Sequence, residues 1–164
     1  MKKISLLFMA FFVVMLSGCF GSGVDKKADS AVVGKELKPF TLNDQFDKPH
    51  TLTKDVKKII FVAAKKSGHE VRNYFNSLPV DYLKKHHYVF VADVSGMPSI
   101  IYKLFAKSDL QKHKYPIWLI FDDKNSKEFK NDKKADEILL ITLDDFVVKK
   151  VEYFKDVKSF EKAL

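Results

Sequence analysis

The sequence predicts an α/β fold in which helices flank a mixed sheet, and three observations carry this prediction. Short apolar runs that fit buried strands occur at residues 57–64, 88–94 and 115–121. Segments with helical apolar spacing separate these runs, as crossovers between parallel strands require. Two later runs, at residues 138–143 and 146–154, flank a tight acidic turn and predict an antiparallel hairpin.

The folded domain is expected to begin near Val33 and to open with a short hairpin. Its two strands are predicted at residues 39–42 and 49–52. The Asn- and Asp-rich residues between them favour a turn. The next apolar run, residues 57–64, has charge at its start and is typical of a strand that is buried on both faces.

The first helix is predicted from apolar side chains that recur every three or four residues. It is expected to begin at His69, with Ser67 as its cap and Glu70 three residues further on. Pro79 ends or kinks this helix. Its apolar face comprises Val71, Tyr74, Phe75 and Leu78.

The second predicted helix follows Pro98, because proline favours the first helical turn. Its apolar face comprises Ile100, Ile101, Leu104 and Phe105. The strongly charged residues 127–137 predict a surface loop. Asp156 is predicted to cap a last helix. The apolar face of this last helix comprises Val157, Phe160 and Leu164.

The chain carries a formal charge of +8, and lysine supplies almost all of the excess because Arg72 is the only arginine. Nucleic-acid recognition favours arginine, whose planar fork matches bases and phosphates. The composition therefore argues against a nucleic-acid partner. It fits a solvated lysine surface, or alternatively a surface that meets anionic lipid headgroups.

The first nineteen residues contain two lysines and then an uncharged apolar run from Ile4 to Leu16, and they end in Ser17-Gly18-Cys19. The run is shorter than the ~20 residues that a spanning helix needs, so a cleaved signal fits it better than a membrane span. The stretch resembles the signal peptide and lipobox of bacterial lipoproteins. This resemblance implies a diacylglycerol on the Cys19 thiol, cleavage after Gly18 and acylation of the new amino terminus. The alternative is a plain secretory signal with a stray cysteine.

The lipoprotein resemblance divides the chain into a signal peptide (residues 1–18), the lipidated Cys19 with a flexible tether (19–32) and one domain (33–164). Removing the signal leaves 27 basic and 21 acidic residues, a formal charge of +6. A tether of this length reaches roughly 20 Å as a random coil. The domain is therefore expected beside a bacterial membrane, in the periplasm or on the outer face, with the choice between inner and outer membrane left open.

Cys19 is the only cysteine, which limits the chemistry of the domain. Once lipid occupies its thiol, no disulfide, Cys-x-x-Cys pair or thiolate nucleophile can form in the chain, so thiol-based functions are excluded. The lipid on Cys19 is the only covalent group expected, and no other cofactor is implied. No two of the five histidines have the helical i, i+4 spacing of metal ligands, so no metal site is expected.

Three segments resemble the thioredoxin-like fold, in the form shared by peroxiredoxins and membrane-tethered thiol-disulfide oxidoreductases. The first is the leading hairpin at residues 33–52, and the second is the strand, loop and helix at residues 59–78. The third is residues 115–118, Tyr-Pro-Ile-Trp, where these families have a cis-proline before a strand. The resemblance covers residues 33–164 and implies a thioredoxin-like mixed sheet flanked by helices.

The same resemblance places the active-site cysteines of these families at residues 66–69, where this chain has none. It therefore implies the fold and argues against the redox activity. Lys65, Lys66, Ser67 and His69 form the candidate binding site. They lie where a central strand ends and a helix begins, a position at which free N–H groups and the helix dipole favour anions.

Tyr115 and Pro116 are the expected neighbours of this candidate site. A cis Pro116 would shape a groove for an extended peptide, whereas the alternative is an ordinary proline at the entry to a strand. Asp93, at the end of its predicted strand, is expected to cap a turn or else to line the cleft.

Three roles follow from these observations. The first is a membrane-anchored envelope lipoprotein whose redox-inactive domain binds a protein or peptide and is not an enzyme. The second is an anion- or small-ligand-binding protein, or a thiol-independent enzyme, that uses residues 65–69, with Ser67 as nucleophile and His69 as base. The third is a purely structural envelope protein.

Overall fold

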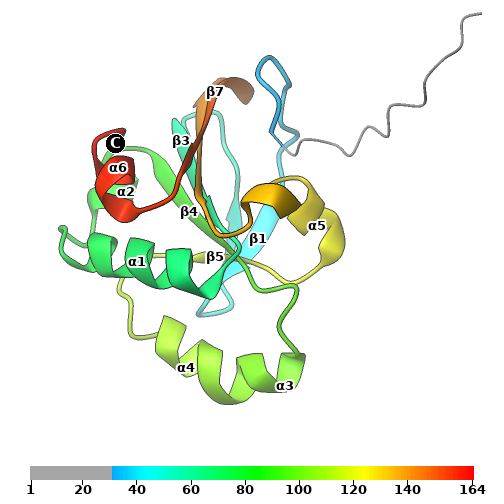
Figure 1. Ribbon diagram of the computed structural model, residues 1–164, viewed down its shortest axis with the longest axis vertical. Coiled ribbons are helices and arrows are strands. Elements are labelled where there is room, and N and C mark those ends of the chain that lie inside the picture. Colours follow the sequence, from blue (N-terminus) through cyan, green and yellow to red (C-terminus); the bar gives the residue numbers. More distant parts are fainter. Residues whose placement is uncertain (1–30) are drawn as a thin grey trace, which may run out of the picture.

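The computed structural model describes residues 31–164, which form a seven-stranded sheet with helices packed against it (Figure 1). The expected signal peptide, Cys19 and most of the expected tether lie outside the described residues. The strands are β1 (Thr41–Asp44), β2 (Pro49–Thr51), β3 (Lys58–Val62), β4 (Tyr88–Asp93), β5 (Trp118–Ile120), β6 (Ile138–Asp144) and β7 (Val147–Phe154). The helices are α1 (Lys65–Asn76), α2 (Tyr82–Lys85), α3 (Ser99–Ile101), α4 (Lys107–Leu110), α5 (Asp123–Lys127) and α6 (Val157–Glu161), with a π-helical turn η1 (Tyr102–Ala106) and a 3-10 turn η2 (Asp132–Lys134).

The sheet is mixed, as the sequence predicts, and its strand order is β2-β1-β5-β4-β3-β6-β7. Strand β4 pairs in parallel with both β3 and β5, and every other pair of neighbours is antiparallel. The carboxyl ends of β3, β4 and β5 therefore lie along one edge of the sheet. In open α/β sheets this is the edge at which ligands bind.

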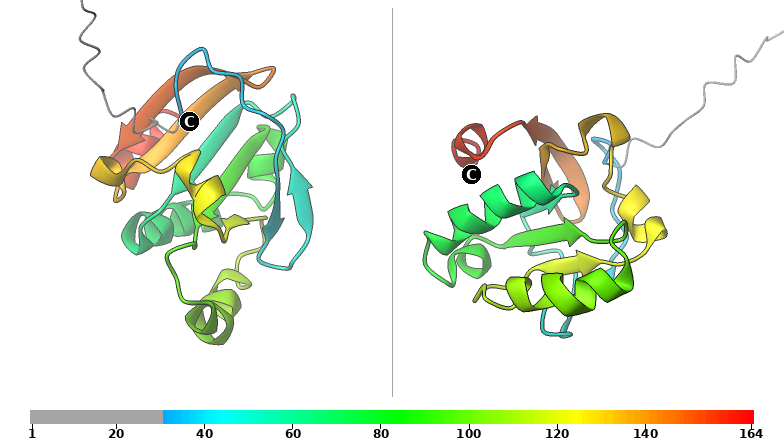
Figure 2. Two further views of the ribbon diagram at one scale, coloured as in Figure 1. Left: turned by 90° about the vertical axis from the view of Figure 1, so that its right-hand side faces the viewer. Right: turned by 60° about the horizontal axis from the view of Figure 1, so that its bottom comes forward.

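Alternate side chains of the central strands divide the core between the two faces of the sheet. Ile59 and Phe61 of β3 lie in one apolar cluster, and Ile60 and Val62 lie in the other. Helices α1, α4 and α6 pack against the second cluster, on the same face of the sheet (Figure 2). The first cluster is covered by Phe129, which follows α5, and by the N-terminal segment.

Helix α1 begins at Lys65, four residues before the predicted start at His69. Ala64 occupies the N-cap position and makes no side-chain hydrogen bond, so the prediction that Ser67 caps this helix is wrong. Ser67 is instead buried inside the first turn, where its hydroxyl donates to the carbonyl oxygen of Ala64 over 3.2 Å. Residues 65–69 are therefore a helical turn and not a loop.

The second predicted helix is a helical segment composed of α3, η1 and α4, and we call it the α3–α4 segment. Tyr102 and Leu110 anchor it to the core. The predicted apolar face lies outside the core, because the stripe that contains Tyr102 and Leu110 packs in its place. The exposed fractions are 63% for Ile100, 43% for Ile101, 63% for Leu104 and 64% for Phe105.

Pro116 precedes β5, and its peptide bond is trans, since residues 31–164 contain no cis peptide bond. The strand order also separates Pro116 from the start of α1. Strands β3 and β5 both run parallel to β4, so the residue that enters β5 lies at the opposite edge of the sheet from the residue that leaves β3. The strand antiparallel to β3 on its other side is β6, which the chain enters through Glu137 and not through a proline.

The predicted turn of the leading hairpin and the predicted cap of the last helix are confirmed. Asp44 shapes the leading hairpin, because its Oδ1 accepts from the backbone N–H groups of Phe46 at 2.8 Å and Lys48 at 3.0 Å. Asp156 caps α6 by accepting from the backbone N–H of Ser159 at 2.8 Å. The charged segment at residues 127–137 differs from the prediction, because it contains the end of α5 and η2 and is not a single loop.

Candidate functional site

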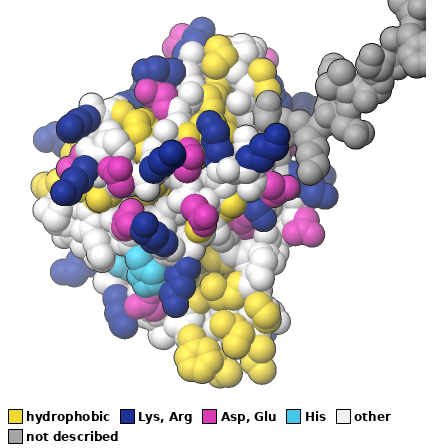
Figure 3. Space-filling model, viewed as in Figure 1, with side chains coloured by type: hydrophobic (Ala, Val, Ile, Leu, Met, Phe, Trp, Pro, Cys, Tyr) yellow, Lys and Arg dark blue, Asp and Glu magenta, His cyan; other side chains and the backbone are white. Residues whose placement is uncertain are grey.

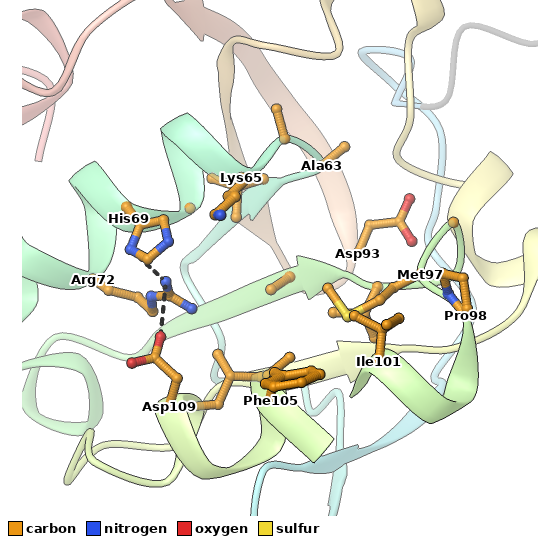
Figure 4. A pocket seen from close by; sticks show the side chains of 18 of the residues that line it. Ala63, Lys65, His69, Arg72, Asp93, Met97, Pro98, Ile101, Phe105 and Asp109 are labelled. Atoms are coloured by element: carbon orange, nitrogen blue, oxygen red, sulfur yellow. Dashed lines mark hydrogen bonds and ion pairs between the residues drawn. The ribbon is translucent and has the colours of Figure 1, made fainter. Parts of the chain in front are cut away.

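A cavity of about 800 Å³ opens where α1 and the α3–α4 segment meet the carboxyl ends of β3 and β4 (Figure 4). Its lining is mainly apolar. The apolar residues are Val62, Ala63, Ala64, Ala92, Val94, Met97, Pro98, Ile101, Phe105, Ala106 and Leu110. A concave site of this size, with an apolar wall and a few polar groups, is the usual form of a ligand-binding site.

Two of the predicted site residues, Lys65 and His69, line this cavity from the first turns of α1. They are four residues apart, so they lie on one face of the helix. Gly68 also lines the cavity, and a Cβ there would come 3.8 Å from Val62 Cγ2. The first-turn N–H groups have no capping side chain, so the positive end of the α1 dipole adds to the charge of Lys65.

Arg72 lies one turn further along α1 and joins Lys65 and His69 in what we call the basic end of the cavity. Its Nη2 lies 2.8 Å from His69 Nδ1 and 3.5 Å from Asp109 Oδ2 (Figure 4). The Arg72 side chain is only 13% exposed, and its buried Nε has no hydrogen-bond partner among the described residues. Asp109 also pairs with Lys112 at 3.2 Å, so one carboxylate is shared between two cations.

The protonation state of His69 follows from its contact with Arg72. A guanidinium can only donate, so the Nδ1 of His69 accepts and the proton of the neutral ring lies on Nε2. Burial of the ring, and then the charge of Arg72, lower the pKa of His69 below its ordinary value of 6.5. At pH 7 the ring is therefore neutral, and its Nε2–H can donate to a ligand.

Asp93 both caps a turn and lines the cavity, so the two roles that the sequence left open are combined. Its Oδ1 accepts from the backbone N–H of Ser95 at 2.9 Å, and its Oδ2 accepts from the hydroxyl of Ser126 at 2.6 Å. Two donors thus hold the carboxylate at the carboxyl end of β4, where it borders the cavity beside Met97 (Figure 4).

The other four predicted site residues do not line the cavity. The side chain of Lys66 is 80% exposed, with its Nζ 3.9 Å from Glu70 Oε1, and Ser67 is buried within α1. Tyr115 is buried beneath α1, and its hydroxyl donates to the carbonyl oxygen of Arg72 over 2.9 Å. Pro116 is exposed at the other edge of the sheet. The structure therefore brings only Lys65 and His69 together at this site.

Sequence reasoning missed Arg72 and Asp109, and it misplaced the apolar wall that Ile101 and Phe105 form. One signal was present for Arg72, because it is the only arginine and follows His69 by three residues, which is the spacing of neighbours on a helix face. No sequence pattern indicated Asp109, because its contact with Arg72 joins two helices that are far apart in the chain.

The lining of the cavity holds neither a cysteine nor a Ser67–His69 pair. Residues 31–164 contain no cysteine, since the only one in the chain is Cys19. The Ser67 hydroxyl donates to Ala64, and the Nδ1 of His69 accepts from Arg72, so these contacts do not form a nucleophile–base pair. Within the same residues, no three His, Cys, Asp or Glu side chains gather as possible metal ligands, and no helix is long and apolar enough to cross a membrane.

Comparisons with known proteins identify the fold. Neither a scan against protein-family models nor a search of curated proteins finds a match. Among solved structures, StoA from Bacillus subtilis matches with a TM-score of 0.54 and 12% identity, over 76% of this chain and 95% of that chain. The peroxidoxin BcpB from Mycobacterium tuberculosis matches with a TM-score of 0.53 and 14% identity, over 80% of this chain and 93% of that chain.

A third match is the thioredoxin domain of a thiol-disulfide oxidoreductase from Bacteroides vulgatus, with a TM-score of 0.51 and 12% identity, over 80% of this chain and 97% of that chain. Identities this low show the fold alone. The protein therefore has a thioredoxin-like α/β fold, as the sequence resemblance implied. Its described residues hold a mainly apolar cavity at the start of α1 and no cysteine.

Proposed function

We propose that the protein is a membrane-anchored envelope lipoprotein whose redox-inactive thioredoxin-like domain binds a protein or peptide partner. The single observation that carries this proposal is the cavity between α1 and the α3–α4 segment. It opens at the carboxyl edge of the parallel strands, where α/β sheets bind ligands, and its lining contains no thiol.

The exposed apolar side chains next to the cavity support a macromolecular partner over a small solute. Ile101 and Phe105 line the cavity and are also 43% and 64% exposed. Monomeric proteins in water rarely expose a contiguous patch of large apolar side chains, and such a patch usually marks an interaction site. The lipid anchor in this proposal rests on the lipobox pattern that ends at Cys19.

Site-specific photo-crosslinking in intact cells tests the proposal. The full chain would carry a benzophenone amino acid in place of Met97, which lines the cavity, or in place of the exposed Lys149 on β7 as a matched control. We expect a discrete protein adduct from position 97 that position 149 does not give. Identical adducts from both positions, or none from position 97, would contradict a binding role for the cavity.

A further inference from the structure

The outer side of the α3–α4 segment is an apolar surface that continues from the cavity wall. We call Ile100, Ile101, Leu104 and Phe105 the apolar patch. Figure 3 shows a hydrophobic area at this end of the molecule, next to histidine and basic side chains. Two members of the patch, Ile101 and Phe105, also line the cavity, so the cavity and the patch form one continuous surface.

The α3–α4 segment has an irregular backbone, and it carries the apolar patch on its outer side. The π-helical turn η1 interrupts the segment between α3 and α4 and supplies both Phe105 and Ala106 to the cavity. Single π-helical turns inside helices occur frequently at functional sites. Tyr102 and Leu110 on the inner stripe anchor the segment in the core, whereas the outer stripe is exposed.

The opposite wall of the same cavity carries unbalanced positive charge. Lys65 and Arg72 are cationic, His69 can donate from Nε2, and the first-turn N–H groups of α1 lie beside them. Asp109 is the acidic partner of Arg72, and it is shared with Lys112. Among residues 31–164 the buried Nε of Arg72 has no acceptor, which costs free energy until a ligand or water supplies one.

The position of the N-terminal segment favours a protein occupant over the membrane. Gly34 N–H donates to Val148 O over 2.8 Å, so the described chain starts beside β7. In Figures 1 and 2 this blue segment lies at the end of the molecule away from α3. The described chain therefore begins at the end of the domain away from the apolar patch, so an anchor attached there does not require the patch to face the membrane.

We infer that the cavity and the apolar patch bind a segment of a partner protein in which large apolar side chains lie next to a carboxylate. The apolar side chains pack on Ile101 and Phe105, and the carboxylate accepts from Arg72 and Lys65 at the basic end. This inference rests on the proposed function and specifies its ligand. The carboxylate belongs either to a chain terminus or to an acidic side chain.

Peptide selection on the full chain tests the inference. The lipidated protein is held in phosphatidylcholine nanodiscs and mixed with a synthetic pool of peptides that have randomised apolar positions. In one arm each peptide occurs as a C-terminal acid and as its amide, and in a second arm it carries an internal glutamate or glutamine. We expect one arm to show at least about tenfold enrichment of the carboxylate form, the size expected for a charge-assisted hydrogen bond.

Three substitutions identify the residues that cause this enrichment. Lys65→Gln and Arg72→Gln should each reduce the carboxylate preference severalfold while retaining apolar selection. Lys66→Gln is the matched control, because Lys66 lies in the same turn but outside the cavity, and it should leave the preference unchanged. Phe105→Ser should weaken binding of both forms equally. Because Lys65 is exposed, Lys65→Gln is expected to fold, and it tests the basic end even if Arg72→Gln does not fold.

Four results would overturn the inference. The first is an enrichment ratio near one in both arms, for C-terminal acid over amide and for glutamate over glutamine. The second is no peptide enrichment at all, and the third is a loss of carboxylate preference in Lys66→Gln as large as in Lys65→Gln. The fourth is binding to phosphatidylglycerol vesicles that Phe105→Ser abolishes. A ratio near one together with a Met97-specific adduct in cells would contradict only the ligand class. Loss of both signals would contradict the proposed function as well.

Discussion

At the scale of single residues, Gly68 shows how the site departs from what stability alone would favour. It lies in the first turn of α1, where glycine costs about 0.5–1 kcal/mol relative to alanine. A Cβ at this position would make only an ordinary 3.8 Å contact with Val62. The fold therefore tolerates a side chain here, and the glycine leaves that volume to the cavity.

We predict that Gly68→Ala raises the free energy of unfolding by about 0.5–1 kcal/mol, because alanine loses less backbone entropy in a helix. Urea denaturation of the two proteins measures this difference. Gly34→Ala is the matched control and should instead lower stability, because Gly34 has a φ of +86° that alanine adopts poorly. A loss of stability in Gly68→Ala would show that the first turn of α1 is more crowded than the structure indicates.

His113 is the histidine most completely buried in the domain, at 8% exposure. Its Nδ1 lies 2.9 Å from Asn76 Oδ1 on α1. Burial first, and then the charge of Arg72, lower the pKa of His113 below its ordinary value of 6.5, whereas Asp109 acts in the opposite direction. The folded protein thus holds the ring neutral at a pH at which the unfolded chain is already protonated.

Linkage gives the sign of the resulting pH dependence. Below pH 6.5 the unfolded chain binds a proton at His113 more readily than the folded protein does. The contribution of His113 to the free energy of unfolding is therefore fully present above that pH, and it is lost as the pH falls toward the lower pKa of His113 in the folded protein. We predict that the urea midpoint decreases between pH 7.5 and pH 5.5, and that it decreases less in His113→Gln. Equal decreases in the two proteins would exclude His113 as a source of the effect.

At the scale of elements, the α3–α4 segment has two apolar sides with different roles. Leu110 is 4% exposed within the core, and Leu104 on the same segment is 63% exposed. We predict that Leu110→Ala costs about 2–5 kcal/mol, whereas Leu104→Ala changes stability by less than about 0.5 kcal/mol. Thermal or urea unfolding of this matched pair measures both values. A large loss for Leu104→Ala would mean that the outer side chains stabilise the fold and are not free for a partner.

Local patterns of the sequence were sufficient to predict most elements. Apolar runs located the strands, the Asn- and Asp-rich residues indicated the first turn, and Asp156 was correctly expected to cap α6. These features depend on residues that are close in the chain. The start of α1 was missed because Ala64 takes the N-cap position without the side-chain acceptor that normally marks a helix start.

The candidate site was predicted only in part, because it depends on contacts between distant segments. Lys65 and His69 were found from their place after β3, but Asp109 joins them through an ion pair across two helices. The apolar spacing of Ile100, Leu104 and Phe105 predicted a helix correctly, but it does not specify which side of the segment faces the core. Pro116 was placed beside residues 65–69 at the start of α1, which the strand order excludes.

The position of Pro116 is instead explained by a buried amide. Gln45 follows β1 and is fully buried. Its Nε2 donates to the carbonyl oxygen of Tyr115 at 2.9 Å, and its Oε1 accepts from the backbone N–H of Ile117 at 2.9 Å. These contacts hold the residues on both sides of Pro116 at the entry to β5. They give the trans proline a structural role away from the cavity.

At the scale of the whole molecule, the proposed lipidation site Cys19 and the cavity lie in different parts of the chain. The lipobox predicts acylation of Cys19, and the thioredoxin-like domain contains no further cysteine. We predict that Cys19→Ser abolishes incorporation of labelled palmitate. Metabolic labelling of the two proteins at equal levels measures this effect. A Cys19→Ser protein that still incorporates palmitate would contradict lipidation at Cys19.

The central claim is that the cavity at the start of α1 binds a partner without thiol chemistry. Gly96 lines this cavity, and its Cβ position has no atom within 4 Å, so Gly96→Trp can obstruct the cavity without a clash at its Cβ position. The decisive measurement is the yield of the Met97 photo-crosslinked adduct in cells, compared between the native chain and Gly96→Trp at equal protein levels. We predict that the adduct is lost in Gly96→Trp while the urea midpoint is retained. An undiminished adduct in a folded Gly96→Trp protein would contradict the claim.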